Sequence, residues 1–218
     1  MDTRDIPVII NNRNRLTTLK ALVTWLEKAG MRKIVVIDNA STYPPLLSYY
    51  LKFPHSLCML RDNVGYLALW EAGTYREFAG AHFFYTDSDV VPVEECPPDF
   101  ADYLFAILER YPSIEKVGLG LVLDDIPDAN RAKGEILARE RPFWKRAVAK
   151  GVFDALVDTT FALYRPFARG GYWARAYRTG PPYVARHLPW YVDSGCLSDE
   201  EIYYRSHATS DSYWSERS

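Results

Sequence analysis

The sequence contains no long apolar run, and this absence excludes a helix that spans a membrane. Nowhere do 18 or more apolar residues follow one another, and the opening stretch MDTRDIPVIINNRNR lacks the apolar run of a secretory signal peptide. We therefore expect a cytoplasmic protein without a transmembrane segment, for which peripheral contact with a membrane surface stays open.

Cysteine and net charge are also scarce. The three cysteines, Cys58, Cys96 and Cys196, are far apart and predict neither a disulfide framework nor a metal-binding motif, which fits a reducing cytosol. The 26 basic and 28 acidic side chains leave a net charge of -2. This balance argues against a nucleic-acid partner held by bulk electrostatics, but it leaves room for a local basic site for one phosphorylated ligand.

What the sequence does contain is an alternation of apolar strands and amphipathic helices. Its 218 residues, 48% of them hydrophobic, suffice for one domain with a sizeable core. In the first half the patterns predict strands at 7–10, 33–38, 56–61 and 82–86, and helices at 16–26, 45–52 and 67–78. This order predicts an α/β fold with a largely parallel sheet, helices on both faces, and a ligand at the carboxyl ends of the strands.

The second half is less regular. Its patterns predict a helix at 100–111, a buried strand at 116–123, a short helix at 142–150 and a last strand at 158–166. From Phe167 onward glycine, proline, arginine and aromatic residues dominate, which predicts a loop-rich C-terminal lid.

Two aspartates close the fourth predicted strand, HFFYT, in the sequence HFFYTDSDVVP. Residues i and i+2 of an extended chain point the same way, so Asp87 and Asp89 are expected to aim at one point beyond the sheet. Two carboxylates so close are unfavourable unless a cation lies between them or one is protonated. Hard carboxylate ligands suit Mg²⁺ or Mn²⁺, which would leave coordination positions for the oxygens of a diphosphate. The alternative is a solvated turn.

The same residues fit a second chemistry. FFYTDSDVV matches the pattern of haloacid-dehalogenase-type phosphatases, in which the first aspartate, here Asp87, is a nucleophile and the second, Asp89, an acid or base. Asp124 and Asp125 even supply paired acids after a later strand. In that fold, however, the nucleophile follows the first strand, whereas here three strand-helix units come first.

Four segments, in order, resemble nucleotide-sugar-dependent glycosyltransferases of the GT-A fold, particularly the family-2-like bacterial enzymes. They are PVIINNRNRLTTLKALVTWLEKAG, IVVIDNAST, RDNVGYLALWEAG and YTDSDVVP, which together cover 7–92. The resemblance implies a single GT-A domain over 1–218, with a nucleotide-binding half at 1–92 and an acceptor and lid half at 93–218.

The resemblance also implies roles for individual residues. Asp38 would accept a hydrogen bond from the nucleobase, and Asp87 would face the ribose or a metal-bound water. Asp89 would bind the metal that bridges the diphosphate. The other residues that the resemblance implies for the nucleotide are Asn11, Arg13, Asn63, Gly65 and Ser88. Ordinary turn formation at Asp38 and a plain loop at Asn63-x-Gly65 are the alternatives.

The second half departs from the family pattern, because the usual Glu-Asp pair is missing. Asp158, at the start of the last predicted strand, is the candidate base that would deprotonate an acceptor hydroxyl and give inversion, and Asp193 is the other candidate. A retaining enzyme would need no such base. The family often completes its metal site with a C-terminal histidine, which implies His207 here, with His187 as the alternative.

The C-terminal region offers further binding residues. Arginines suit phosphate oxygens and aromatic rings suit sugars, so a closing lid would favour transfer over hydrolysis. The arginines are Arg165, Arg169, Arg175, Arg178 and Arg186. The aromatic residues are Trp190, Tyr191, Tyr203, Tyr204, Tyr213 and Trp214, which form either an acceptor wall or part of the core.

The sequence thus predicts a glycosyltransferase, dependent on Mn²⁺ or Mg²⁺, that moves a sugar from a UDP, GDP or dTDP donor to a hydroxyl of a saccharide or other acceptor, as in polysaccharide biosynthesis. A phosphatase that uses Asp87 and Asp89, and a non-catalytic module that binds nucleotide sugars, are the alternatives.

Overall fold

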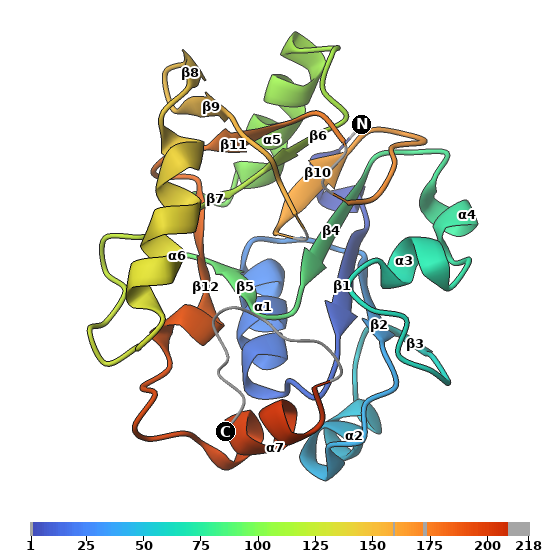
Figure 1. Ribbon diagram of the computed structural model, residues 1–218. Helices are drawn as coiled ribbons and strands as arrows, with labels where there is room; N and C mark the ends of the chain where they lie inside the picture. Colours follow the sequence, from blue (N-terminus) through green and yellow to red (C-terminus); the bar gives the residue numbers. More distant parts are fainter. Residues whose placement is uncertain (1, 159, 172–173, 209–218) are drawn as a thin grey trace.

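The amino-terminal half forms four parallel strands that lie side by side. The computed structural model describes residues 2–158, 160–171 and 174–208. Strand β1 (Val8–Asn12) lies between β2 (Ile34–Asp38) and β4 (Phe83–Asp87), and β3 (Ser56–Met59) is the edge strand beside β2. Because all four are parallel, their carboxyl ends meet at one edge of the sheet. In Figure 1 this edge faces the lower end of the molecule.

Five further strands extend this sheet beyond β4, in the order β3-β2-β1-β4-β10-β6-β11-β9-β8. They are β10 (Ala162–Tyr164), β6 (Lys116–Gly118), β11 (Ala176–Thr179), β9 (Val152–Asp154) and β8 (Ala147–Ala149). All strands of the nine except β9 and β10 run in the same direction. The predicted α/β fold with a mostly parallel sheet is therefore confirmed.

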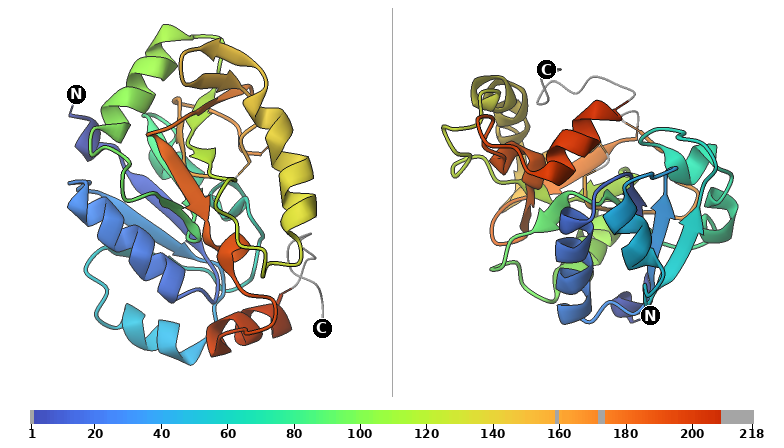
Figure 2. Two further views of the ribbon diagram at one scale, coloured as in Figure 1. Left: turned by 90° about the vertical axis from the view of Figure 1, so that its left-hand side faces the viewer. Right: turned by 90° about the horizontal axis from the view of Figure 1, so that it is seen from below.

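Helices cover both faces of the sheet (Figures 1 and 2). One core cluster holds Val8 and Ile10 of β1, and a second cluster on the opposite face holds Ile9. Strand β1 is thus buried on both faces, which explains its unbroken apolar run. The helices that contribute to the first cluster are α1 (Thr17–Lys28), α2 (Pro44–Tyr50), α5 (Phe100–Arg110) and α6 (Lys133–Glu140). Those that contribute to the second are α3 (Ala68–Glu71) and α4 (Tyr75–Phe78).

A second, three-stranded sheet joins the first at the two aspartates. It has the order β5-β12-β7, formed by β5 (Val90–Pro92), β12 (Val184–His187) and β7 (Gly120–Leu121). Only Ser88 and Asp89 separate β4 of the large sheet from β5 of the small one. Strand β12 runs antiparallel to β5 and pairs His187 with Val90, so this histidine is brought next to Asp89.

Several predicted elements are divided or replaced. The helix expected at 67–78 is two short helices separated by Gly73, whose φ of 76° interrupts the helix. The strand expected at 116–123 is split between the two sheets as β6 and β7, and the helix expected at 142–150 is a 3-10 turn followed by β8. The remaining elements are η1 (Thr3–Asp5), η2 (Arg141–Trp144), η3 (Leu188–Tyr191) and α7 (Asp199–Ser206).

The segment from Phe167 onward is more regular than the loop-rich lid that the sequence predicts. Strand β11 lies inside the large sheet and β12 is the middle strand of the small one. Four of the five arginines that the sequence offers for phosphate binding are paired with carboxylates elsewhere in the fold, which anchors them. The pairs are Arg165–Glu109, Arg169–Glu115, Arg178–Glu140 and Arg186–Asp125. Over the described ranges, no helix is both long enough and apolar enough to cross a membrane.

Candidate active site

Asp87 is fixed at the carboxyl end of β4 by its neighbour on β1. The side-chain amide of Asn11 donates to Oδ1 of Asp87 at 3.1 Å, and the two residues are in register. The backbone N–H of the buried Ser88 donates to the carbonyl of Asn11 at 3.0 Å. Asn11 and Ser88, which the sequence predicts to bind nucleotide, thus hold the first aspartate at the rim of the sheet.

Asp89 faces a histidine of the small sheet. Its Oδ1 is buried, accepts no hydrogen bond from the described residues and lies 3.5 Å from Nε2 of His187. Burial lowers the pKa of His187 and the charge of Arg15 lowers it further, although Asp89 opposes this shift. The imidazole is therefore neutral at pH 7, the form in which histidine binds metals.

Asp158 also lies near the carboxyl end of β4, on the side of this strand opposite to β1. Strand β10 runs antiparallel to β4, so the residues just before it lie at the carboxyl end of β4. Oδ1 of Asp158 is buried and accepts no hydrogen bond from the described residues. Burial, and then the charges of Asp158 and Asp87, raise the pKa of Tyr164, while Asp158 and Asp89 both act on the pKa of His187. The three aspartates therefore lie at the same edge of the sheet, close to the carboxyl end of β4.

The Asp89–His187 pair fits part of the coordination shell of a divalent ion. Two ligand atoms bound to one ion at about 2.1 Å lie roughly 3 Å apart, close to the separation observed here. No group of three histidine, cysteine, aspartate or glutamate side chains within the described ranges is placed to hold an ion by itself. Asp89 and His187 would thus supply two protein ligands, and water and ligand oxygens would complete the shell.

His207 and Asp193 have local roles in the structure. His207 is exposed at the end of α7, where its ring stacks on Tyr203 at 4.0 Å and its Nδ1 lies 2.9 Å from that residue's carbonyl oxygen. Oδ1 of the exposed Asp193 accepts the backbone N–H of Gly195 at 2.7 Å, which forms a turn. The histidine that lies against Asp89 is His187, the sequence-based alternative to His207.

Asp38 is fully buried at the end of β2, and both of its carboxylate oxygens are used inside the protein. Oδ1 accepts the backbone N–H of Ser41 and Oδ2 accepts the hydroxyl of Tyr50, each at 2.8 Å. This arrangement favours the turn-forming alternative over recognition of a nucleobase.

The Asn63-x-Gly65 loop is tied to the end of β2. Oδ1 of Asn63 accepts the N–H of Gly65 at 3.0 Å, and the φ of Gly65 is 82°, which favours glycine. The buried Asn39 donates to the carbonyl of Gly65 at 2.7 Å and accepts the N–H of Val64 at 2.8 Å. The loop is thereby held at the carboxyl edge of the sheet, next to the end of β2.

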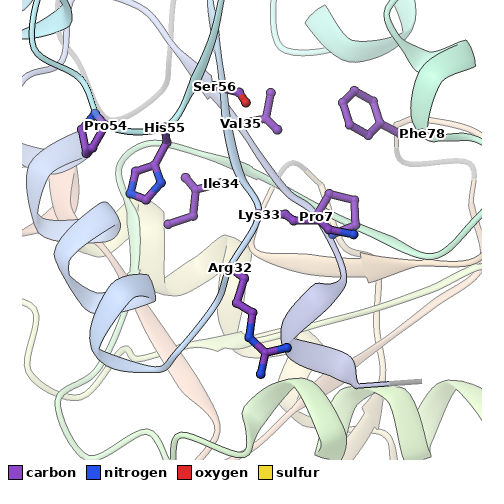
Figure 3. Close-up of a pocket in the computed structure, with 9 residues that line it drawn as sticks. All are labelled: Pro7, Arg32, Lys33, Ile34, Val35, Pro54, His55, Ser56 and Phe78. Atoms are coloured by element: carbon purple, nitrogen blue, oxygen red, sulfur yellow. The ribbon is translucent and has the colours of Figure 1, made fainter.

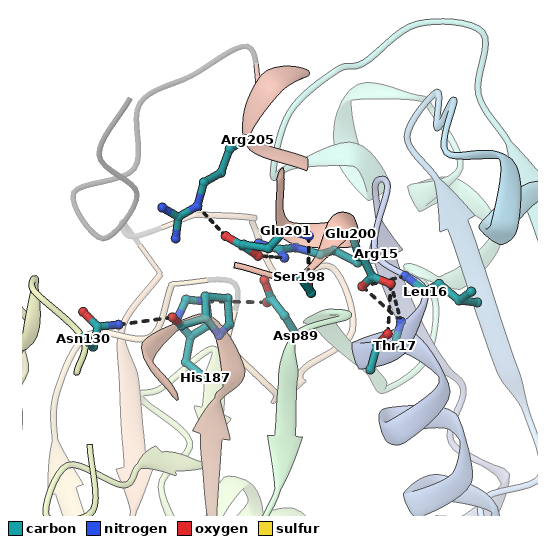
Figure 4. Close-up of polar contacts among 11 residues, drawn as sticks. Arg15, Leu16, Thr17, Asp89, Asn130, His187, Ser198, Glu200, Glu201 and Arg205 are labelled. Carbon is teal, nitrogen blue, oxygen red and sulfur yellow. Dashed lines mark hydrogen bonds and ion pairs between the residues drawn. The ribbon is translucent and has the colours of Figure 1, made fainter. Parts of the chain in front are cut away.

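Helix α7 lies across this edge, and its Glu200 and Glu201 were not predicted from the sequence (Figure 4). Arg15, 5% exposed, forms an ion pair with Glu201, and its guanidinium lies 3.6 Å from the ring centre of Tyr204. Glu200 accepts hydrogen bonds from the backbone N–H groups of Leu16 and Thr17, at the start of α1. Tyr204 is within electrostatic range of Asp87 and Asp89, since both charges raise its pKa after the larger effect of burial.

The aromatic residues divide between core and rim. Trp190 is buried, and its ring centre lies 4.9 Å from that of His187, so it supports the histidine from the core side. Tyr203 donates to the hydroxyl of Thr42 at 3.0 Å on the rim. Tyr172, Trp173, Tyr213 and Trp214 lie outside the described residues.

A depression of about 550 Å³ lies elsewhere, at the amino ends of the parallel strands (Figure 3). Its basic side chains include Arg32, which pairs with Asp2 and Asp5, and His55, which pairs with Glu27. It is remote from the aspartates, and ligands of parallel α/β sheets bind at the opposite edge. We therefore assign the candidate site to the carboxyl edge.

Comparison with known proteins gives similarity at the level of structure only. No protein-family model and no curated protein matches the chain. Among solved structures, S. aureus TarS 1–349 is similar with a TM-score of 0.48 and 12% identity over 86% of this chain. GalNAc-T7 with UDP, GalNAc and Mn²⁺ is similar with a TM-score of 0.49 and 13% identity over 93%. The chain spans 62% and 50% of these two structures, less than two thirds of either.

Proposed function

We propose that this chain is a glycosyltransferase of the GT-A type that transfers a sugar from a nucleoside diphosphate donor to a hydroxyl acceptor with the help of Mn²⁺ or Mg²⁺. The observation that carries this proposal is the convergence of Asp87, Asp89, His187 and Asp158 on one rim of the sheet. Buried carboxylate oxygens of Asp89 and Asp158 without hydrogen-bond donors among the described residues support a cation and a proton as their partners.

The residues divide the work between the donor and the acceptor. Asp89 and neutral His187 would hold the ion, and Asp87, fixed by Asn11, would face the ribose or an ion-bound water. The bound ion would supply positive charge for the departing diphosphate. Asp158 would take the proton of the acceptor hydroxyl as its oxygen attacks the anomeric carbon and the bond to the diphosphate breaks, which inverts that carbon.

Thermal shift measurements with UDP, GDP, dTDP and CMP, each with and without Mn²⁺, test the donor site. We expect one nucleotide to raise the melting temperature of the wild type only when the ion is present, because diphosphate and ion bind together. Asp89→Asn and His187→Gln should each weaken this binding at least tenfold. His207→Gln is the matched control and should bind as the wild type does, since that exposed histidine stacks on its own helix.

Transfer assays distinguish the alternatives. The proposed enzyme releases nucleoside diphosphate from a donor sugar and loses this activity with Asp158→Asn while it keeps nucleotide binding. A phosphatase would instead release phosphate from simple esters and lose that activity with Asp87→Asn. A binding module would bind nucleotide without turnover and would be indifferent to Asp158→Asn. Full metal-dependent binding by Asp89→Asn would contradict the proposed site.

A further inference from the structure

A lysine is fully buried in the large sheet close to Asp158. Lys116 is the first residue of β6, where it is paired with Tyr164 on β10, and its exposed fraction is 0%. Lysine is rarely buried completely unless its charge is compensated. The complete burial of Lys116 therefore needs an explanation other than packing.

The ammonium of Lys116 donates hydrogen bonds to two backbone carbonyls and one side-chain hydroxyl. Its Nζ donates to the carbonyl of Gly171 at 2.9 Å, to the hydroxyl of Tyr164 at 3.3 Å and to the backbone carbonyl of Asp158 at 3.4 Å. It also lies 5.0 Å from the centre of the Tyr164 ring. The lysine thus bonds directly to the main chain of the candidate base and ties it to the segment that follows β10.

All three acceptors are neutral groups, so the ammonium is not held by a direct ion pair in this shell. The carboxylate of Asp158 still attracts it from nearby, as the charge of that group acts on the lysine. Within the candidate site, the nearby negative charge is therefore that of Asp158, the residue whose main-chain carbonyl Lys116 already binds.

We propose that Lys116 is a positioning residue for Asp158, which holds the base at the sugar site and keeps a positive charge beside its carboxylate. This inference rests on the proposed function, because it concerns the base of that reaction. It adds a residue of β6 to a site otherwise formed by β1, β4, β12 and the segment before β10.

The lysine also gives the site a pH dependence that can be measured. The pKa of Lys116 is lowered to about 8, chiefly by burial and in part by the charge of Arg178, while Asp158 and Glu115 oppose this shift. Tyr164, the remaining titratable group in contact, has a raised pKa and is neutral in this range. Above about pH 8 the wild type should lose the positive charge beside Asp158.

The experiment compares the wild type with Lys116→Met, Lys116→Arg and, as a matched control, Lys133→Met, which removes a partly exposed lysine of α6. Hydrogen exchange of the amides at 155–158 and 168–171 should become at least tenfold faster in Lys116→Met. Its kcat should fall at least tenfold while the KM of the donor changes less than twofold. Lys116→Arg, which stays charged, should recover part of kcat and lack the decline above about pH 8 that the wild type shows.

Each other outcome overturns a defined claim. Unchanged exchange in Lys116→Met would overturn the positioning role whether or not the chain is an enzyme. Faster exchange with wild-type kcat would overturn its part in the reaction and leave the proposed function intact. If Lys116→Met does not fold, the pH profiles test the inference. It is overturned if the kcat of the wild type stays constant between pH 7 and 9.5, or if the kcat of Lys116→Arg declines above about pH 8 as that of the wild type does. Absence of transfer by the wild type with every donor would overturn the proposed function and this role with it.

Discussion

At the residue scale, the polar groups at the strand ends divide into those used inside the protein and those left for a ligand. Asp38 belongs to the first kind. The side-chain amide of Asn12 donates to the hydroxyl of Tyr50 at 2.7 Å, and that hydroxyl donates to Asp38. Asp89 and Asp158 belong to the second kind, because each has a buried oxygen without a hydrogen-bond donor among the described residues.

The Tyr50 hydroxyl can be tested as the centre of this internal network. Tyr50→Phe should lower the free energy of unfolding by about 2 kcal/mol, because it leaves a buried carboxylate oxygen and a buried amide without their partner. Urea denaturation at pH 7 measures the change. Tyr49→Phe, on the same helix and partly buried, is the control and should change stability by less than about 0.5 kcal/mol. Equal stability of Tyr50→Phe and wild type would reopen Asp38 to nucleobase recognition.

At the element scale, helix α7 closes the carboxyl edge by contacts with two loops. Glu200 and Glu201 bind the start of α1 and Arg15, and Tyr203 binds Thr42 in the β2–α2 loop. The views of Figures 1 and 4 show α7 over the end of the molecule to which β1 and β4 point. A donor nucleotide at this edge would therefore meet α7 as one wall of its site.

The buried pair between Arg15 and Glu201 predicts an acid-sensitive contact. Burial opposes ionisation of Glu201, but Arg15 and then Arg205 outweigh it and lower the pKa of Glu201 below its ordinary value of 4.5. A carboxyl whose pKa is lowered on folding stabilises the fold above the unfolded value, and this stability is lost as the pH falls below about 4.5.

Glu201→Gln should accordingly lower the free energy of unfolding by about 2 kcal/mol at pH 7, because it leaves the charge of Arg15 buried. The difference from the wild type should shrink as the pH falls below about 4.5, because the carboxyl of the unfolded wild type is protonated first and that of the folded protein at a lower pH. Denaturant titrations at pH 7 and below pH 4 measure both values. Glu200→Gln, which keeps one of the two oxygens that accept hydrogen bonds at the start of α1, is the control. A Glu201→Gln deficit that does not depend on pH would contradict the ionic origin.

The elements that the sequence predicted best are those whose local pattern agrees with their burial. The runs at 7–10, 33–38 and 82–86 are apolar because helices cover both faces of β1, β2 and β4, so periodicity and tertiary contacts agree. Helix α7 was missed because its hydrophobic face is weak, yet Ser198 accepts the N–H of Glu201 at 3.2 Å. This Ser-x-x-Glu spacing is a helix-start signal that the reading could have used.

The candidate site, like the fold, could be predicted from the sequence only in part. Asp87, Asp89 and Asp158 could be proposed as site residues because strand ends can be located in sequence, and the order of strands brings such ends together. Which histidine faces Asp89 depends on the pairing of β12 with β5, which joins positions 187 and 90. Nothing in the local sequence of either segment fixes that register, so His187 and His207 could not be separated beforehand.

At the scale of the whole molecule, two sheets are joined at two crossings. The chain passes from β4 to β5 through Ser88 and Asp89, and from β6 to β7 through Leu119 alone. Strand β12 then pairs with both β5 and β7, so the two crossings are held side by side. The position of Asp89 relative to the large sheet therefore depends on the packing around the connection from β6 to β7.

Gly120 is the residue where this packing is tightest. A Cβ atom at this position would lie 2.2 Å from the carbonyl oxygen of Thr179 and 2.8 Å from the ring of Trp144, so backbone as well as side chains would have to shift. Gly120→Ala should therefore lower the free energy of unfolding by about 3 kcal/mol, the upper range for overpacking. Because the shift reaches β12, we also expect metal-dependent nucleotide binding to weaken with it.

The control for Gly120 is a glycine with open space around it. Gly134 in α6 has no atom within 4 Å of a built Cβ, and alanine is the better helix former, so Gly134→Ala should gain about 0.5 kcal/mol. Thermal unfolding followed by circular dichroism compares the two variants with the wild type. If Gly120→Ala melts at the wild-type temperature, the two sheets are not fixed to each other at this crossing, and the placement of His187 against Asp89 must then depend on the pairing of β12 with β5 alone.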